Sequence, residues 1–100
     1  MKTINIAKDF SDSTGARYYT DGDFSGEEFR KIFLIPIFDK YSKIIIILDG
    51  TEGYATSFLE ESFGGLARSL GSKEVKNKFI FISNEEPELI EEIMTYIEEA

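Results

Sequence analysis

The sequence predicts an α/β domain built around a mostly parallel sheet. Two hydrophobic strands and two amphipathic helices alternate in its second half. Residues 44–48 (IIIIL) form an unbroken aliphatic run, which is typical of a central parallel strand covered on both faces, and residues 78–83 (KFIFIS) form another strand. The helices are expected at about 57–70 and after Asn84. This alternation favours right-handed crossovers, and 100 residues suit one domain spanning 1–100.

The N-terminal fifth predicts two more strands. Residues 2–7 (KTINIA) alternate apolar and polar side chains, and residues 17–20 (RYYT) have the composition of a short strand. The Ser, Asp and Gly residues between them indicate a turn, so the two strands are expected to pair antiparallel. The predicted sheet therefore has four strands, mostly parallel, with an N-terminal antiparallel pair.

Three helices are expected around this sheet. Ser25 and Glu28 have the spacing of a capping box, and Pro36 predicts a kink or an end about three turns later. The second helix follows the strand at 44–48, and the third is capped by Asn84. The predicted buried positions of the first helix are Phe29, Ile32, Phe33 and Ile37.

The composition excludes several classes of function. The chain has no cysteine and no histidine, which removes thiol nucleophiles, Ser-His-Asp triads and the common zinc ligands. We therefore expect a protein that is not an enzyme and that needs no cofactor or metal. The net charge of −8 disfavours nucleic acid and anionic membranes as partners. Without a long apolar segment or a signal peptide, a cytoplasmic location is expected.

Thr56 and Ser57 are the most informative polar residues because they open the second helix. A helix N-terminus presents unpaired N–H groups and the positive end of the helix dipole, so it stabilises a phosphate. A simpler interpretation is that the hydroxyls only cap the helix, with Thr56 as N-cap or Ser57 paired with Glu60 in a capping box. Both interpretations stay open at this point.

Beyond these patterns, the segments DGDFSGEEFR and LDGTEGYATSFLEESFGGLAR resemble the bacterial STAS-like family. STAS denotes the domain shared by sulfate transporters and anti-sigma-factor antagonists. The resemblance implies a STAS-like α/β fold. It also implies that Asp49 matches the aspartate at the end of the antagonists' strand and that Ser57 matches their phosphoacceptor serine, with Thr56 in place of the preceding aspartate. The kinase of such antagonists is a histidine-kinase-like ATPase.

The leading functional hypothesis is a non-enzymatic interaction domain that binds a protein partner and is switched by phosphorylation at Ser57 or Thr56. The alternative is a small-ligand sensor in which the turn from Gly50 to Ser57 holds a nucleotide or another anion. Under either hypothesis, the expected contact residues are Asp49, Gly50, Gly53, Tyr54, Phe58 and Glu61.

Overall fold

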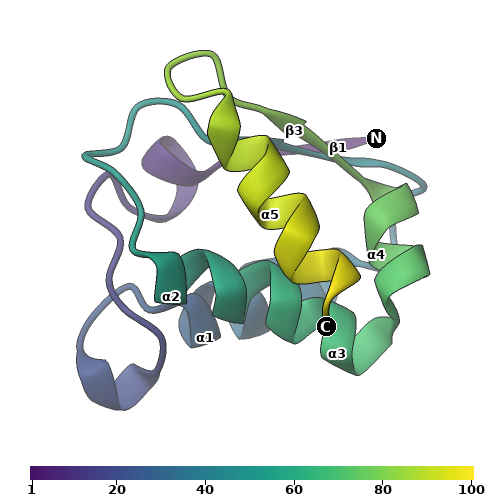
Figure 1. The fold of residues 1–100 in the computed structure, drawn as a ribbon, viewed down its shortest axis with the longest axis horizontal. Helices are drawn as coiled ribbons and strands as arrows, with labels where there is room; N and C mark the ends of the chain where they lie inside the picture. Colours follow the sequence, from purple (N-terminus) through teal and green to yellow (C-terminus); the bar gives the residue numbers. More distant parts are fainter.

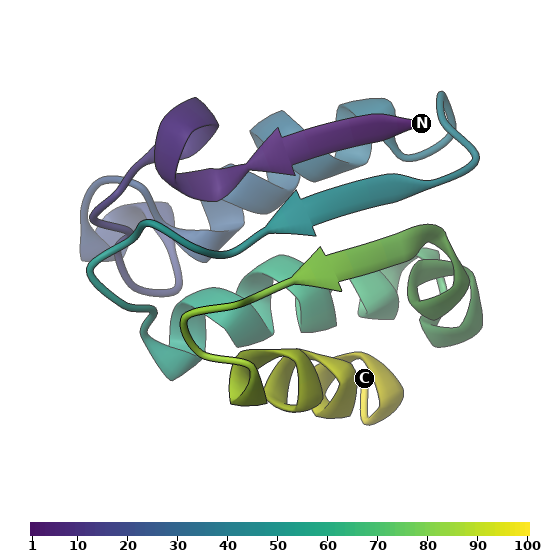
Figure 2. The same ribbon diagram turned by 90° about the horizontal axis from the view of Figure 1, so that it is seen from above.

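Three parallel strands form the sheet. The computed structural model describes residues 1–100 and places the strands in the order β1 (Lys2–Asn5), β2 (Ile44–Ile47) and β3 (Phe79–Ile82). Ile4, Ile46 and Phe81 lie side by side in one row across the sheet. Figure 2 shows all three strands running in the same direction. The prediction of an α/β fold with a parallel sheet is confirmed.

The predicted N-terminal antiparallel pair is wrong, and the sheet has three strands instead of four. Residues 19–21 form a short 3-10 turn, η2 (Tyr19–Asp21). Its backbone donors are used locally, because the Tyr18 N–H donates to the Asp21 carboxylate at 2.9 Å and the Tyr19 N–H donates to the Glu27 carboxylate at 2.9 Å. A segment whose amides are bound by nearby carboxylates has none to offer a strand ladder.

The first strand ends earlier than predicted. Residues 6–10 turn into a single wide helical turn, η1 (Ile6–Phe10). The Asn5 side chain accepts a hydrogen bond from the Lys8 N–H at 3.1 Å, and the Asp9 carboxylate accepts one from the Asn5 N–H at 2.8 Å. These two reciprocal bonds stop the strand at Asn5.

The first predicted helix is present and begins as expected. It comprises α1 (Gly26–Phe29), η3 (Arg30–Leu34) and η4 (Ile35–Ile37), and the Ser25 hydroxyl accepts the Glu28 N–H at 3.1 Å. The helix tightens at Pro36 and ends there, as predicted. One predicted core position is wrong: Ile32 is 58% exposed, and Leu34 is buried instead. The wider hydrogen-bonded turn of η3 explains this shift, because it rotates the following side chains around the helix axis.

The second helix runs without a break through α2 (Thr56–Leu59), η5 (Glu60–Gly64) and α3 (Gly65–Leu70). A further short helix, α4 (Ser72–Lys78), was not predicted, and it leads directly into β3. The last helix is α5 (Glu88–Glu98). None of these helices has the length and hydrophobicity that a membrane span requires.

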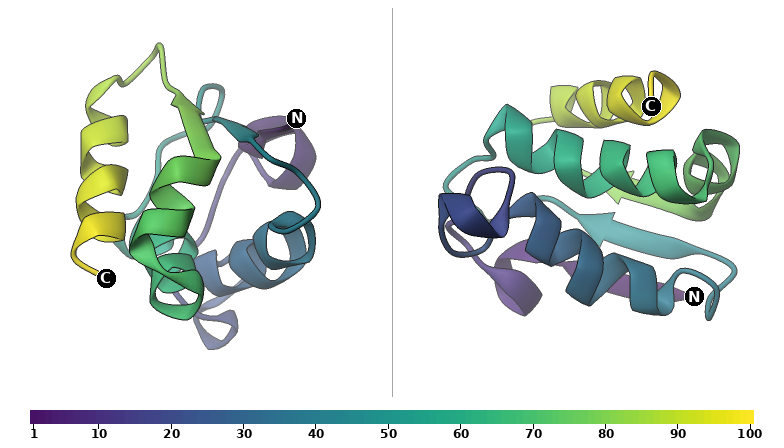
Figure 3. Two further views of the ribbon diagram at one scale, coloured as in Figure 1. Left: turned by 90° about the vertical axis from the view of Figure 1, so that its right-hand side faces the viewer. Right: turned by 90° about the horizontal axis from the view of Figure 1, so that it is seen from below.

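Helices cover one face of the sheet only (Figures 1 and 2). Figure 3 shows α1, α2 with α3, and α5 side by side in one layer against the strands. Between the layers lies the core, which includes Ile4, Phe29, Ile44, Ile46, Phe58, Phe63, Leu66 and Ile93.

The expectation that β2 is covered on both faces is therefore wrong. Ile44, Ile46 and Leu48 point into the core, whereas Ile45 and Ile47 point to the opposite face and are half-buried. No helix crosses in front of the strands on that face in Figure 2.

Candidate functional site at the start of α2

The loop from β2 to α2 is tied to the loop that follows β3. The Asp49 carboxylate accepts hydrogen bonds from the backbone N–H groups of Glu85, at 2.9 Å, and Asn84, at 2.9 and 3.2 Å. In return, the Glu85 carboxylate accepts the Gly50 N–H at 2.7 Å. The amides of Glu85 and Asn84 lower the pKa of Asp49, so this carboxylate is charged and acts as a clamp between the two loops.

Gly50 and Gly53 shape the same loop through their backbone conformation. Their φ angles are +96° and +127°, a region that side-chain-bearing residues rarely adopt. These two predicted site residues therefore set the path of the chain from the end of β2 to the start of α2.

Tyr54 joins this loop to the core. Its hydroxyl donates to the Leu48 carbonyl at 2.7 Å, and its ring stacks on Phe58 with 5.8 Å between centroids. Burial raises the pKa of Tyr54 to about 12, so the hydroxyl stays protonated as a donor. Tyr54 is half-buried instead of fully exposed, so only part of its side chain is accessible.

Phe58 does not belong to a docking surface. Its side chain is fully buried, and it packs against Phe10 and Phe29 as well as Tyr54. The prediction that Phe58 contacts a partner is wrong because its helix face turns inward. Phe58 packs against Tyr54 from the core side of the helix.

Thr56 and Ser57 occupy the first turn of α2, but they do not cap it. The N-cap is Ala55, whose extended backbone starts the helix and whose carbonyl accepts the N–H groups of Phe58 and Leu59. No side-chain cap bond exists, so the capping interpretation is wrong for both hydroxyls. Thr56 is exposed and Ser57 half-exposed, which leaves two hydroxyl groups accessible beside the N-terminal amides of a fifteen-residue helical run.

One turn further along, Glu60 and Glu61 lie in a cluster of charges with three arginines. Arg17 Nη1 is 2.6 Å from Glu60 and 3.2 Å from Glu61, and Arg68 contacts Glu60 through two nitrogens at 2.6 and 3.1 Å. Arg30 Nη2 lies 2.8 Å from Glu61. Mainly because of the Arg68 bonds, the pKa of Glu60 is lowered to about 2. This arginine–glutamate cluster carries a net charge of +1, from three arginines and two glutamates.

Glu61 was predicted to contact a partner or ligand directly, and its placement contradicts that role. It is 7% exposed and is held by Arg30 and Arg17. The sequence patterns of residues 43–66 do not predict the three arginines. Arg68 could have been found, since Glu60 and Arg68 lie two helical turns apart on one face. No local pattern places Arg17 or Arg30 there, because only the tertiary fold brings α1 and its preceding loop to this helix.

A cavity of about 410 Å³ lies beside the clamp, at the carboxyl end of the strands. Three carboxylates and one lysine line it, so its field repels an anion. No group of three or more carboxylates in the chain is arranged to hold a metal ion. The lining residues are Asn5, Ala7, Lys8, Asp12, Asp49, Gly50 and Glu85.

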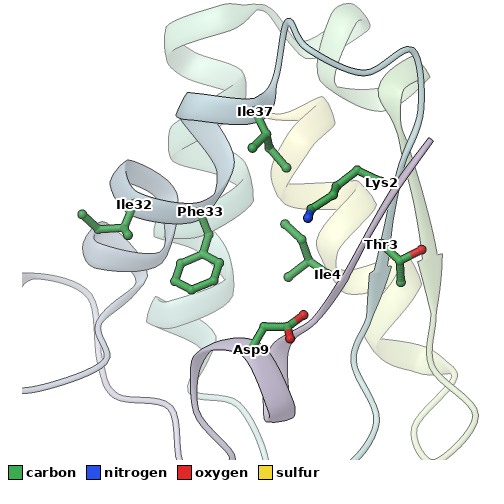
Figure 4. A pocket seen from close by; sticks show the side chains of 7 residues that line it. All are labelled: Lys2, Thr3, Ile4, Asp9, Ile32, Phe33 and Ile37. Carbon is green, nitrogen blue, oxygen red and sulfur yellow. The ribbon is translucent and has the colours of Figure 1, made fainter.

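A second cavity, of about 430 Å³, lies between the outer edge of β1 and the first helix (Figure 4). In Figure 4, Ile4, Phe33 and Ile37 form its apolar wall, while Lys2 and Asp9 stand at the β1 side. None of the predicted site residues lines this cavity. Its two charged groups, Lys2 and Asp9, belong to β1 and to η1.

Comparison with known protein families identifies the class to which this fold and this helix start belong. A family model described as a STAS-like domain of unknown function matches residues 25–89. The match covers α1, β2, the loop clamp, the whole second helix and β3. The chain belongs to this STAS-like family, as its sequence motifs predicted. Comparisons with curated proteins and with solved structures give no match.

Proposed function

We propose that this STAS-like domain is a non-enzymatic regulatory module that docks a protein partner at the first turn of α2 and is switched by phosphorylation of Ser57. The observation that carries the proposal is that neither hydroxyl caps the helix. Because Ala55 provides the N-cap, neither Thr56 nor Ser57 is needed to start the helix. Thr56, which is the more exposed, is the second candidate phosphoacceptor.

The arginine–glutamate cluster supplies a means of sensing the phosphate. Ser57 precedes Glu60 by three residues and Glu61 by four, so all three side chains share one helix face. A phosphoryl group on Ser57 adds a charge of about −1.5 to −2 beside two carboxylates and beside the guanidinium of Arg17. It repels the glutamates and competes with them for Arg17, which both now hold.

Arg17 links this competition to a larger surface. Its backbone carbonyl accepts the Glu27 N–H at 2.9 Å, and the neighbouring Ala16 carbonyl accepts the Gly26 N–H at 2.9 Å. A shift of the Arg17 side chain toward Ser57 is therefore transmitted to the segment that leads into α1. The docking surface that responds consists of exposed groups of the α2 start and of this segment.

The proposed partner is a kinase of the histidine-kinase-like ATPase type, and the proposed location is the cytoplasm. Both follow the resemblance to anti-sigma-factor antagonists and rest on the match of Ser57 to their phosphoacceptor. A protein partner also suits the net charge of −8 better than nucleic acid or an anionic membrane. The alternative of an anion or nucleotide sensor gains no support, since carboxylates dominate the cavity beside Gly50.

The test is affinity capture of the full chain from its native cell, followed by mass spectrometry of the captured partner and of the peptide that contains Thr56 and Ser57. We expect an ATPase-type kinase in the eluate and a phosphate on Ser57 after incubation with ATP. Ser57→Ala should abolish that phosphate, and Ser69→Ala, at an exposed serine on α3, is the matched control. Partner binding with both residues 56 and 57 unmodified would reject the switch and keep the docking role.

A further inference from the structure

The uncovered face of the sheet has the composition of a buried surface. Its side chains are those at alternate positions of the three strands. Across the sheet they form two rows, because Thr3, Ile45 and Ile80 are in register, as are Asn5, Ile47 and Ile82. Ile80 is 42% exposed, and the other three isoleucines are half-buried. Four isoleucines in one contiguous patch on a sheet face are typical of an interface.

The charges at the two ends of this face have opposite sign along the central strand. Lys43 precedes β2 and Asp49 follows it at the same alternate spacing, so the row of Ile45 and Ile47 continues in sequence to Lys43 at one end and Asp49 at the other. Lys43 is exposed, and its ammonium donates one hydrogen bond to the Asn77 carbonyl and has two further N–H groups; Asp49 is partly exposed at the other end. In a second copy that runs in the opposite direction, Asp49 stands opposite Lys43 of the first copy. Such a row is complementary to itself when two copies run in opposite directions.

We propose that a second copy of this chain covers the open face, with the two sheets packed face to face and their strands antiparallel. The two-fold axis lies between the sheets, perpendicular to the strands, at the level of Ile4, Ile46 and Phe81. Each strand then faces its own copy, which is the self-matching geometry of a two-fold interface. Ile45 packs over the partner's Ile47, and Ile80 over the partner's Ile82, at about 10 Å between sheets.

The ends of the face then pair by charge. Lys43 of each copy approaches Asp49 of the other, and there are two such pairs in the dimer. Asp49 accepts two backbone N–H groups within its own chain, and its oxygens have further lone pairs for an ammonium. The opposite arrangement, with parallel strands, places Lys43 over Lys43 and Asp49 over Asp49. Charge therefore selects the antiparallel arrangement.

This interface is separate from the proposed docking site. The helix that carries Ser57, Glu60 and Glu61 lies in the helical layer, on the other side of the sheet (Figures 1 and 2). Dimer formation therefore neither requires nor prevents docking at α2. Either proposal can fail while the other stands.

Sedimentation velocity of the full chain at increasing micromolar concentration tests the dimer. We expect the mass to rise from 11.4 kDa toward twice that value. Ile80→Glu should keep the far-ultraviolet circular dichroism spectrum and abolish the rise, because it buries a carboxylate against the partner's Ile82. Ile32→Glu is the matched control, since Ile32 is 58% exposed on the helical side and should leave dimerisation unchanged.

A charge variant keeps the test decisive if Ile80→Glu does not fold. Lys43→Glu should weaken dimerisation about tenfold or more, because it sets like charges against Asp49 twice in each dimer. Lys31→Glu, the same change on the helical side, should have no effect. A wild-type chain that stays at 11.4 kDa throughout would overturn the proposal. So would equal weakening by the sheet-face and helical-side variants.

Discussion

Asp49 and Glu85 hold each other's loops in place by exchanging hydrogen bonds in opposite directions. The Asp49 carboxylate accepts the N–H of Glu85 at 2.9 Å, while the Glu85 carboxylate accepts the N–H of Gly50, the neighbour of Asp49, at 2.7 Å. This clamp fixes the chain between β2 and α2, and so it fixes where the helix that carries Ser57 begins.

Removing the clamp should loosen both loops without unfolding the domain. Asp49→Ala leaves the N–H groups of Asn84 and Glu85 without their acceptor and is expected to lower the unfolding free energy only slightly, because water can bind these exposed amides. Hydrogen exchange at these two amides should accelerate. Asp49→Asn, which keeps one acceptor oxygen, should fall between wild type and Asp49→Ala. Unchanged exchange in Asp49→Ala would show that the clamp does not hold the loops.

The arginine–glutamate cluster should make the free energy of unfolding depend on pH in the acid range. The pKa of Glu60 is lowered to about 2 from an ordinary value of 4.5, so the unfolded chain takes up this proton first as the pH falls. The contribution of Glu60 is complete above about pH 5 and is lost between about pH 5 and pH 2. Since the side chain is partly exposed, we expect about 1–2 kcal/mol.

Urea unfolding at pH 7 and pH 3 measures this loss. Glu60→Gln should be less stable than wild type at pH 7 and should differ less from it at pH 3. Glu98→Gln is the control, because Glu98 has one ion pair, at 3.5 Å to Lys76, and is more than half exposed. A Glu60→Gln variant with the full acid dependence of wild type would remove Glu60 as its source.

Glu61 should be the most costly glutamate to remove. It is 7% exposed and neutralises Arg30, whose side chain is only 13% exposed. Glu61→Ala leaves that guanidinium buried without a counter-charge, so we expect a loss of about 3–5 kcal/mol in unfolding free energy. Glu27→Ala, which breaks a partly exposed pair with Lys31 at 3.1 Å and removes the acceptor of the Tyr19 N–H, should cost clearly less. Equal losses in the two variants would contradict the burial argument.

Gly26 should tolerate a methyl group far less than Gly64 does. A Cβ on Gly26 would lie 2.6 Å from the Phe58 carbonyl oxygen, which is backbone of the facing helix. A Cβ on Gly64 would also meet an atom at 2.6 Å, but that atom is the carboxylate end of the Glu60 side chain, which can shift together with its arginine partners as backbone cannot. Chemical denaturation should therefore show a loss of about 1–3 kcal/mol for Gly26→Ala and a much smaller change for Gly64→Ala. The reverse order would reject the close packing of α1 on α2.

Local patterns predicted much of the fold. The aliphatic run that became β2, the N-cap at Ser25 and the stop at Pro36 all depend on residues within a few positions of each other. The strand predicted at 17–20 does not form, and here too nearby residues decide the local structure. The carboxylates of Asp21 and Glu27 accept the amides of this segment. A composition pattern does not show whether a backbone N–H will bind a nearby carboxylate or a neighbouring strand.

At the candidate site, too, some features follow from local sequence and others depend on the tertiary structure. Neighbouring residues alone predict that Asp49 follows a strand, that glycines shape the loop, and that Thr56 and Ser57 stand at the start of a helix. Only the tertiary structure decided that Ala55 is the cap, that Phe58 and Glu61 turn inward, and that Arg17 and Arg30 reach Glu61. Helix phase and contacts between distant segments are set by how the layers pack. The same packing left the Ile45 and Ile47 side of the sheet uncovered, where the sequence alone had predicted a buried strand.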